Sequence, residues 1–244
     1  MLRPEIFKGL MSMEEAEFDK FADEYYAIHA DNISVSGEEP AYFAEYKIRD
    51  VVKTCSGLRS STGALSILDF GAGVGTSVPF LRRYMPDARV TCLDVSSKSL
   101  AVGRLRFGND AEFVLFDGSL IPFPDQSFDF VFAACVFHHI DHREHLSLLR
   151  EVFRVLAPGG AVLVYEHNPY NPLTRQAVNT CAFDSNARLI SARVMRRRFV
   201  DAGFLNAFVR YRVFFPASLQ RLRALEPFLT WLPIGAQYYV AAYK

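Results

Sequence analysis

Three aspartates stand at or directly after the ends of short apolar runs. Asp69 lies near the end of SILDF, Asp94 near the end of RVTCLDV, and Asp117 follows EFVLF. Such a carboxylate can accept two hydrogen bonds from a ribose diol, and others can hold an adenine amino group or a cationic amine. If the runs are parallel strands, their carboxyl ends meet at one sheet edge, and the aspartates predict a groove for a positively charged nucleoside. The alternative for each aspartate is a loop or helix cap satisfied by nearby amides.

Three glycines alternate directly after Asp69, at Gly71, Gly73 and Gly75. Glycine accepts a positive φ and lets a ligand approach the backbone, and a following helix offers its N-terminal amides. The dinucleotide-binding fingerprint needs a further glycine where this chain has Thr76, and the charge of Asp69 disfavours a pyrophosphate. The pattern therefore favours a nucleoside ligand and leaves a nicotinamide-dependent reductase as the weaker alternative.

Histidines and an acid follow two later apolar runs, where they would face the same groove. His138 and His139 come after FDFVFAAC, and Glu166 and His167 end AVLVYEH. Imidazole takes up a proton near neutral pH, so we predict His139 or His167 as a catalytic base if the reacting group is protonated. His138 and Glu166 are predicted to line the substrate pocket, with Arg175 as an anion contact.

His142 and His145 extend the histidine-rich segment and raise the question of a metal site. The two residues could share one face of a helix. No cysteine or acid completes a familiar ligand set with them, so no metal is predicted.

The composition excludes several classes of protein. Lysine plus arginine equals aspartate plus glutamate at 27 each, so no overall field recruits nucleic acid, and a small-molecule substrate is expected. The four cysteines lie far apart and form no metal or redox pair, which favours reduced thiols and a cytoplasmic setting. No apolar stretch approaches the roughly 18 residues that span a bilayer, so no stable membrane insertion is expected. No feature specifies an oligomeric state.

The hydrophobic pattern predicts an α/β fold. Apolar runs predict strands over 66–70, 89–95, 112–116, 128–135, 161–167, 207–215 and 237–243. Amphipathic segments between the earlier strands predict helices that cover both faces of a mainly parallel sheet. The clearest helix spans 144–156, and its predicted apolar stripe consists of Leu146, Leu149, Phe153 and Leu156.

Four segments describe the predicted domain organisation. Residues 1–60 are expected to form a helical arm that closes over the site as a lid. Residues 61–244 are expected to form the main domain, with lid insertions near 168–190 and 216–235, because these stretches are long for connecting loops.

Aromatic residues in these segments suggest how the acceptor is covered. Tyr25 and Tyr46 of the arm are predicted to line the substrate pocket, although aromatic residues there could equally bind the arm to the core. Phe228 and Trp231 of the second insertion indicate either a hydrophobic acceptor or a cap on the core.

Four motifs together resemble the class I S-adenosylmethionine-dependent methyltransferases. They are ILDFGAGVGTS, CLDVS, FDGSLIPFPDQSFDFVFAACVFHHI and LREVFRVLAPGGAVLVYE, within about 67–164. The resemblance is greatest to the small-molecule branch that includes the ubiquinone and menaquinone methyltransferases. It implies a Rossmann-like seven-stranded sheet, mostly parallel with an antiparallel last strand, with helices on both faces and S-adenosylmethionine as cofactor.

The resemblance also implies roles for individual residues. The three glycines would flank the methionine part of the cofactor, Asp69 would help hold its amino group, Asp94 the ribose and Asp117 the adenine. Lys47 or His29 could pair with its carboxylate. Four further residues are expected in the cofactor site: Phe70, Val95, Gly118 and Cys135. The predicted function is methyl transfer to oxygen, nitrogen or carbon of a small aromatic or lipophilic acceptor, and the alternative is a catalytically silent cofactor-binding module that partners another enzyme.

Overall fold

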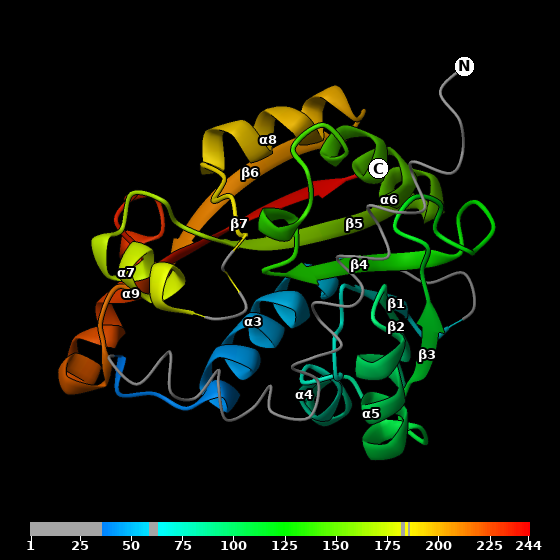
Figure 1. Ribbon diagram of the computed structural model, residues 1–244, viewed down its shortest axis with the longest axis horizontal. Coiled ribbons are helices and arrows are strands. Elements are labelled where there is room, and N and C mark those ends of the chain that lie inside the picture. The colour runs from blue at the N-terminus through cyan, green and yellow to red at the C-terminus, as the bar shows by residue number, and fades with distance from the viewer. Residues whose placement is uncertain (1–35, 59–62, 182–183, 185) are drawn as a thin grey trace.

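The computed structural model describes residues 36–58, 63–181, 184 and 186–244, and the first part of the predicted arm, with Tyr25 and His29, lies outside them. In this part of the chain a seven-stranded sheet has the order β3-β2-β1-β4-β5-β7-β6 (Figure 1). The strands are β1 (Ser66–Phe70), β2 (Arg89–Asp94), β3 (Glu112–Leu115), β4 (Phe128–Ala134), β5 (Leu156–His167), β6 (Leu205–Arg212) and β7 (Gln237–Tyr243). Strands β1 to β5 are parallel, whereas β7 runs antiparallel to β5 and β6. The predicted Rossmann-like sheet with an antiparallel last strand is confirmed.

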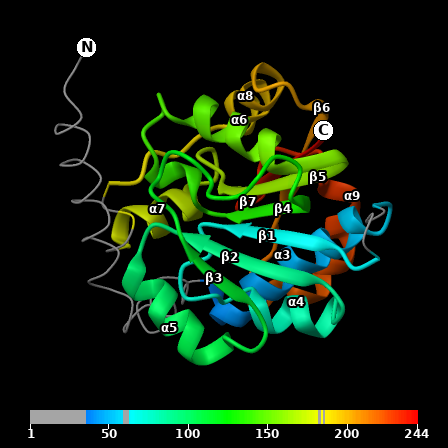
Figure 2. The same cartoon turned by 90° about the vertical axis from the view of Figure 1, so that its right-hand side faces the viewer.

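Helices cover both faces of the sheet, as predicted. The α-helices are α3 (Pro40–Cys55), α4 (Val78–Tyr84), α5 (Ser97–Phe107), α6 (His145–Val155), α7 (Pro172–Thr180), α8 (Ala192–Asp201) and α9 (Glu226–Leu229). Two 3₁₀ segments join them, η2 (Phe137–His139) and η4 (Ala217–Leu225). Figure 2 shows α3, α4 and α5 on one side of the sheet and α6 and α8 on the other.

Strand β4 shows why the strands of this sheet are apolar in their middle. Phe130 and Phe132 belong to the core beneath α3, α4 and α5, whereas Val131 and Ala133 belong to the core beneath α6 and α8. Because both faces are buried, polar side chains are disfavoured within the strand. They collect at its carboxyl end instead, where a site can form.

The structure differs from the predictions around α6. The buried residues of this helix are His145, Leu148, Leu149, Val152 and Val155. Of the predicted stripe, Leu149 is buried, Leu146 and Phe153 are half-buried against the same core, and Leu156 is buried but belongs to β5. Leu156 begins β5, five residues before the predicted start at 161. The Pro158-Gly159-Gly160 segment lies within this strand, between the pairing of Leu156 with Phe128 and that of Ala161 with Phe130 of β4. Strand β6 also begins and ends earlier than predicted.

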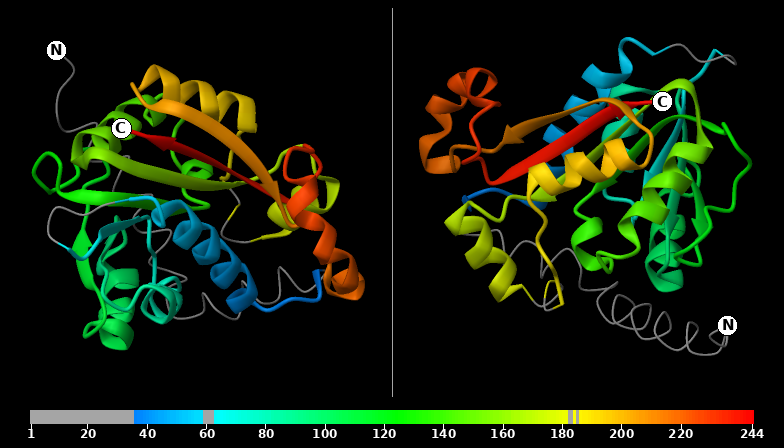
Figure 3. Two further views of the ribbon diagram at one scale, coloured as in Figure 1. Left: turned by 180° about the vertical axis from the view of Figure 1, so that it is seen from behind. Right: turned by 90° about the horizontal axis from the view of Figure 1, so that it is seen from above.

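Both predicted insertions contain helices that lie at one end of the sheet, with α7 in the first insertion and η4 and α9 in the second (Figure 3). The Asn171 side chain accepts a hydrogen bond from Thr174 N at 3.0 Å and so begins α7. The same side chain donates to Ile234 O at 2.8 Å, which fixes the first insertion to the second. Among the described residues, no helix combines the length and apolar character needed to cross a bilayer.

Candidate active site

One cavity of about 1240 Å³ lies along the carboxyl edge of the sheet. Of the predicted site residues, its wall contains Asp69, Phe70, Gly71, Gly73, Asp94, Val95, Asp117, Gly118, Cys135, His138, His139 and His167. The three aspartates therefore meet in one cavity, at what we call its glycine end, and the histidines lie at its histidine end. Pockets for one small ligand typically enclose roughly 300–1,000 Å³, so this volume has room for two ligands.

Four predicted site residues lie outside the cavity wall. Gly75 is needed for packing, because a Cβ there would lie 3.1 Å from the Phe113 ring. Tyr46 is buried and donates a hydrogen bond to Gln237, and Glu166 is buried beneath His138. The fourth, Arg175, lines a separate shallow pocket on α7, so its side chain does not serve this cavity as an anion contact.

The turn after β1 needs glycine at position 71 for two reasons. Gly71 has φ +73°, and a Cβ there would lie 2.5 Å from Val136 Cγ2. Gly73 also has a positive φ, but its missing Cβ faces open space on the cavity wall. The backbone at Gly73 is therefore open to a ligand, as the sequence reasoning expected of this turn.

Asp94 connects the ends of two strands. Its Oδ2 accepts a hydrogen bond from Gly73 N at 2.7 Å, and its Oδ1 accepts one from Ser96 N at 2.9 Å. The carboxylate thus holds the glycine turn against the start of α5 while it lines the cavity. Both the predicted ligand contact and the alternative capping role are compatible with this position.

Asp117 lines the cavity and also organises its own loop. Its Oδ1 accepts hydrogen bonds from Ser119 N at 2.8 Å and Leu120 N at 2.9 Å. Partial burial opposes ionisation, but these amides outweigh it and lower the pKa of Asp117. Asp117 therefore caps its own loop, as the alternative interpretation of this residue predicted.

The pKa of Asp69 is raised, whereas that of Asp117 is lowered. Its side chain is buried, and burial raises its pKa to about 7, which the hydrogen bond from Ser77 Oγ only partly offsets. A cation bound beside Asp69 would favour the ionised form. Asp69 is thus a carboxyl group whose charge depends on what occupies the cavity near neutral pH.

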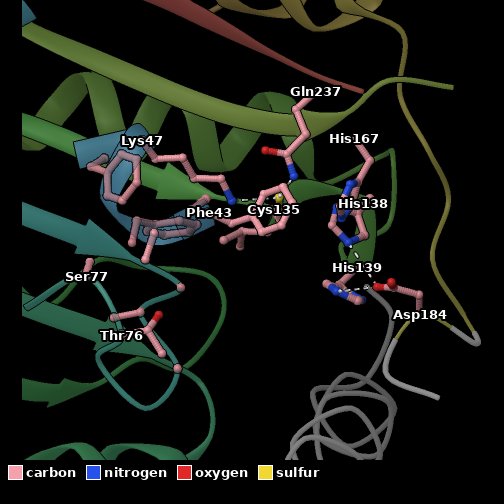
Figure 4. A pocket seen from close by; sticks show the side chains of 18 of the residues that line it. Phe43, Lys47, Thr76, Ser77, Cys135, His138, His139, His167, Asp184 and Gln237 are labelled. Carbon is pink, nitrogen blue, oxygen red and sulfur yellow. Dashed lines mark hydrogen bonds and ion pairs between the residues drawn. The ribbon is translucent and has the colours of Figure 1, made fainter. Parts of the chain in front are cut away.

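Helix α3 contributes a lysine to the centre of the cavity (Figure 4). Lys47 Nζ donates to Cys135 Sγ at 3.5 Å, and Gln237 Nε2 lies 3.8 Å from the same sulfur. Burial opposes ionisation of Cys135, but Lys47 and His167 together outweigh it and lower the thiol pKa to about 7. Cys135 also has a positive φ of 61°, which is uncommon for a residue with a side chain.

A buried polar network holds α3 in this position. Asp50 accepts a hydrogen bond from Tyr165 Oη and forms an ion pair with Arg212, whose Nε lies 2.8 Å from Asp50 Oδ2. Tyr46 donates to Gln237 at the start of β7. The sequence analysis did not predict these contacts, although an acid between buried Ile48 and Val51 was a signal that Asp50 needs a partner.

The histidine end is built on a buried ion pair. His138 Nδ1 lies 2.6 Å from Glu166 Oε2, and Glu166 Oε1 accepts a hydrogen bond from Phe137 N at 2.8 Å. Asp184 of the first insertion lies on the other side, with its Oδ1 3.3 Å from His138 Nε2 and 3.5 Å from His139 Nε2 (Figure 4). Two carboxylates therefore enclose the His138 ring.

The two adjacent histidines differ in protonation state. Burial opposes protonation of His138, but Glu166 and Asp184 outweigh it and raise the pKa of His138 to about 10. Burial and the neighbouring charged ring of His138 lower the pKa of His139 to about 3. At neutral pH His138 is thus an imidazolium and His139 a neutral imidazole.

Asp184 supplies the acid that the sequence reasoning found lacking for a metal. The ligand atoms of His138, His139 and Asp184 all lie within 4.8 Å of one another, which is close enough to share a cation. An imidazolium cannot coordinate a metal, so a cation there must displace the His138 proton. Asp184 was missed because it lies 46 positions from His138 in the sequence.

Comparisons with known proteins agree with this fold. A family model described as a methyltransferase domain matches residues 68–164. The ubiquinone/menaquinone biosynthesis C-methyltransferase UbiE of Pseudomonas fluorescens is 30% identical over 188 residues, 72% of this chain and 69% of that protein. UbiE of Hahella chejuensis is 34% identical over 137 residues, 53% of each chain, so this chain spans about half the length of that relative.

The fold is also found in solved structures. A methyltransferase from Thermotoga maritima, described as a possible histamine N-methyltransferase, has a TM-score of 0.66 at 20% identity over 95% of this chain and 99% of that one. This chain belongs to the class I S-adenosylmethionine-dependent methyltransferases. Within that class its sequence is similar to the UbiE enzymes. The predicted family, fold class and cofactor are thereby confirmed.

Proposed function

We propose that this chain transfers a methyl group from S-adenosylmethionine to a ring carbon of a lipophilic phenol or quinol. The observation that carries the proposal is one large cavity whose two ends differ in chemistry. The UbiE relatives are named as C-methyltransferases of ubiquinone and menaquinone biosynthesis, which supports carbon as the accepting atom and an aromatic ring as the acceptor.

The glycine end fits the cofactor. The open space at Gly73 lets a ligand reach the backbone, as a cofactor that lies along this turn requires. We assign the ribose hydroxyls to Asp94, the adenine to Asp117 and the amino group to Asp69, and all three residues line the cavity. When bound there, S-adenosylmethionine supplies a methyl group activated by a sulfonium.

The histidine end is proposed to bind and activate the acceptor. Removal of a phenol proton raises the electron density at the ring carbons, so a base beside the acceptor oxygen promotes methylation there. The methylated ring carbon then gives up its own proton, and a proton returns to the oxygen to restore the aromatic phenol. His138 is already protonated, and the low pKa of His139 makes it a weak base. We therefore assign proton removal to His167, which lines the cavity at the end of β5.

Binding and turnover test the proposal separately. Calorimetry should detect S-adenosylmethionine binding that Asp94→Ala weakens. Mass spectrometry should then find a methylated product from a panel of alkylated phenols and quinols, with turnover lost in His167→Ala and retained in His142→Ala. Absence of cofactor binding would overturn the proposal. Cofactor binding without methyl transfer to any acceptor would support the silent binding module, and NADH binding would support the reductase.

A further inference from the structure

The second insertion carries an apolar residue at every third position. These residues are Leu219, Leu222, Leu225, Phe228, Trp231 and Ile234, and they define what we call the docking face. Residues three apart eclipse one another in a 3₁₀ helix, so Leu222 and Leu225 lie on one side of η4, which has a kink at Leu219. All six are exposed, with Phe228 at 75% and Trp231 at 70%. Neither Phe228 nor Trp231 caps the core, contrary to one of the two sequence interpretations.

The docking face continues to the mouth of the cavity. Asn168 Nδ2 donates to Gly235 O at 2.8 Å, and Asn171 bonds Ile234 O, so the start of α7 lies against the end of the docking face. Tyr170 and Leu173 of this region are also exposed, at 68% and 60%. Leu173 lines the cavity, so the exposed apolar surface reaches the opening through which an acceptor would enter.

The two insertions carry exposed positive charge, although the whole chain is neutral. Positions 167–237 hold ten arginines and three acidic residues, but four of these arginines lie on α8, and Arg212 and Arg223 form ion pairs with Asp50 and Glu38. Each of these acids is engaged within the protein: Asp184 with His138, Asp201 with Arg197, and Glu226 with the backbone amide of Phe214. Arginines on the two insertions, Arg175 and Arg221, are exposed.

We propose that the docking face binds the surface of an anionic phospholipid bilayer. Exposed tryptophan, phenylalanine and leucine beside arginine form the composition of segments that lie in a membrane interface, where apolar side chains enter the acyl boundary and cations meet lipid phosphates. This inference rests on the proposed function, because a lipophilic acceptor dissolved in that bilayer would reach the cavity past Leu173 without crossing water. The contact is peripheral and uses no membrane-spanning helix.

Trp231 makes the proposal directly measurable, because it is the only tryptophan in the chain. Vesicles of phosphatidylglycerol and phosphatidylcholine should shift its fluorescence to shorter wavelength, and brominated acyl chains should quench it. Pure phosphatidylcholine vesicles should bind at least about tenfold more weakly, because charge contributes to the contact. Added salt should weaken binding to the anionic vesicles.

Matched variants separate the face from the rest of the surface. Phe228→Ser should weaken vesicle binding about tenfold, whereas Leu105→Ser, at a residue that is 89% exposed on α5, should leave it unchanged. Arg221→Glu should weaken binding about fivefold or more, and Arg150→Glu on α6 should not.

The proposal would be overturned if anionic vesicles left the Trp231 fluorescence unchanged, or if the protein bound neutral vesicles as tightly as anionic ones. It would also be overturned if Leu105→Ser weakened vesicle binding as much as Phe228→Ser. A fluorescence shift that follows protein concentration without lipid would overturn it too, because it would indicate that a second copy of the chain covers the docking face. Vesicle binding requires neither cofactor nor turnover. Methylation of a short-tailed acceptor without vesicle binding would therefore refute only the docking, and vesicle binding without any methyl transfer would refute only the proposed function.

Discussion

The two ends of the cavity differ in how far apart their residues lie in the sequence. At the glycine end, Gly73 and Asp94 are 21 positions apart and follow adjacent strands. At the histidine end, Asp184 is 46 positions from His138, and beside the centre of the cavity the Tyr46 contact with Gln237 spans 191 positions. The glycine end is thus specified by short motifs at strand ends, whereas the rest of the cavity depends on how α3, β7 and the first insertion pack together.

The largest predicted effect falls on the histidine end. Glu166→Ala leaves the buried His138 imidazolium without its closest partner and should lower the free energy of unfolding by about 3–5 kcal/mol. Chemical denaturation measures this loss. Glu166→Gln is the matched control, because it retains hydrogen bonding without the charge. An Ala variant as stable as the wild type would show that Glu166 does not support this end.

The ion pair between His138 and Glu166 should also make the free energy of unfolding depend on pH. The folded pKa of His138, about 10, lies above that of a free imidazole. Its stabilising contribution should therefore be fully present below about pH 6.5 and decline as the pH rises towards 10. The stability difference between wild type and Glu166→Gln should shrink over this range. A difference that grows with pH would contradict the assigned charge state.

The second effect falls on the glycine end and compares two glycines with positive φ. Gly71→Ala should cost about 2–4 kcal/mol of unfolding free energy, because backbone strain adds to the clash with Val136. Gly73→Ala should cost about 1–2 kcal/mol, because only the strain applies. Cofactor affinity should nevertheless fall in Gly73→Ala, where the new methyl group enters the cavity. Equal stability of the two variants would refute the close approach at Gly71.

A third test compares two carboxylates of the glycine end. Asp94→Asn should weaken S-adenosylmethionine binding about tenfold to a hundredfold, because a charged acceptor of several hydrogen bonds becomes neutral. Asp117→Asn should weaken it only a few-fold, because the amide oxygen can still accept the loop amides. Calorimetry at one pH and salt concentration gives both values. A larger loss in Asp117→Asn would reverse the proposed ranking.

The smallest predicted effect concerns Asp69 and pH. Burial raises its pKa to about 7 in the ligand-free protein, and an ammonium group beside it would favour the ionised form. Cofactor affinity should therefore fall by up to about tenfold per pH unit below 7 and level off above it. Calorimetry in buffers of different ionisation enthalpy should detect one released proton near pH 6. Asp69→Asn should abolish this slope, and a slope that persists in the variant would assign it to another group.

Much of the fold could be predicted because its strands are buried on both faces. The apolar runs of β1 and β7 locate these strands with the correct boundaries. The start of β5 was missed because Pro158, Gly159 and Gly160 are typical of a turn, yet pairing with β4 extends the strand through them. Tertiary pairing overrode a local signal in that case.

Some residues of the site could likewise be predicted from the sequence, and others could not. Asp69, Asp94 and Asp117 could be placed together because parallel strands bring their carboxyl ends to one edge. Asp184 and Gln237 could not, because nothing in their local sequence states which loop or strand they will meet. Arg175 was misplaced for a related reason: its helix lies at the cavity, but this side chain faces a separate surface.

Strand β7 lies between β5 and β6 and carries Gln237 to Tyr46 and Cys135. Chains are synthesised from the N-terminus, so β1 to β4 can pair on the ribosome before β7 exists. The contact between Gln237 and Tyr46, which helps to hold α3 in place, therefore forms only when β7 inserts between β5 and β6. A nascent chain would therefore form the glycine turn early, and enclose a ligand there only once this late strand has been added.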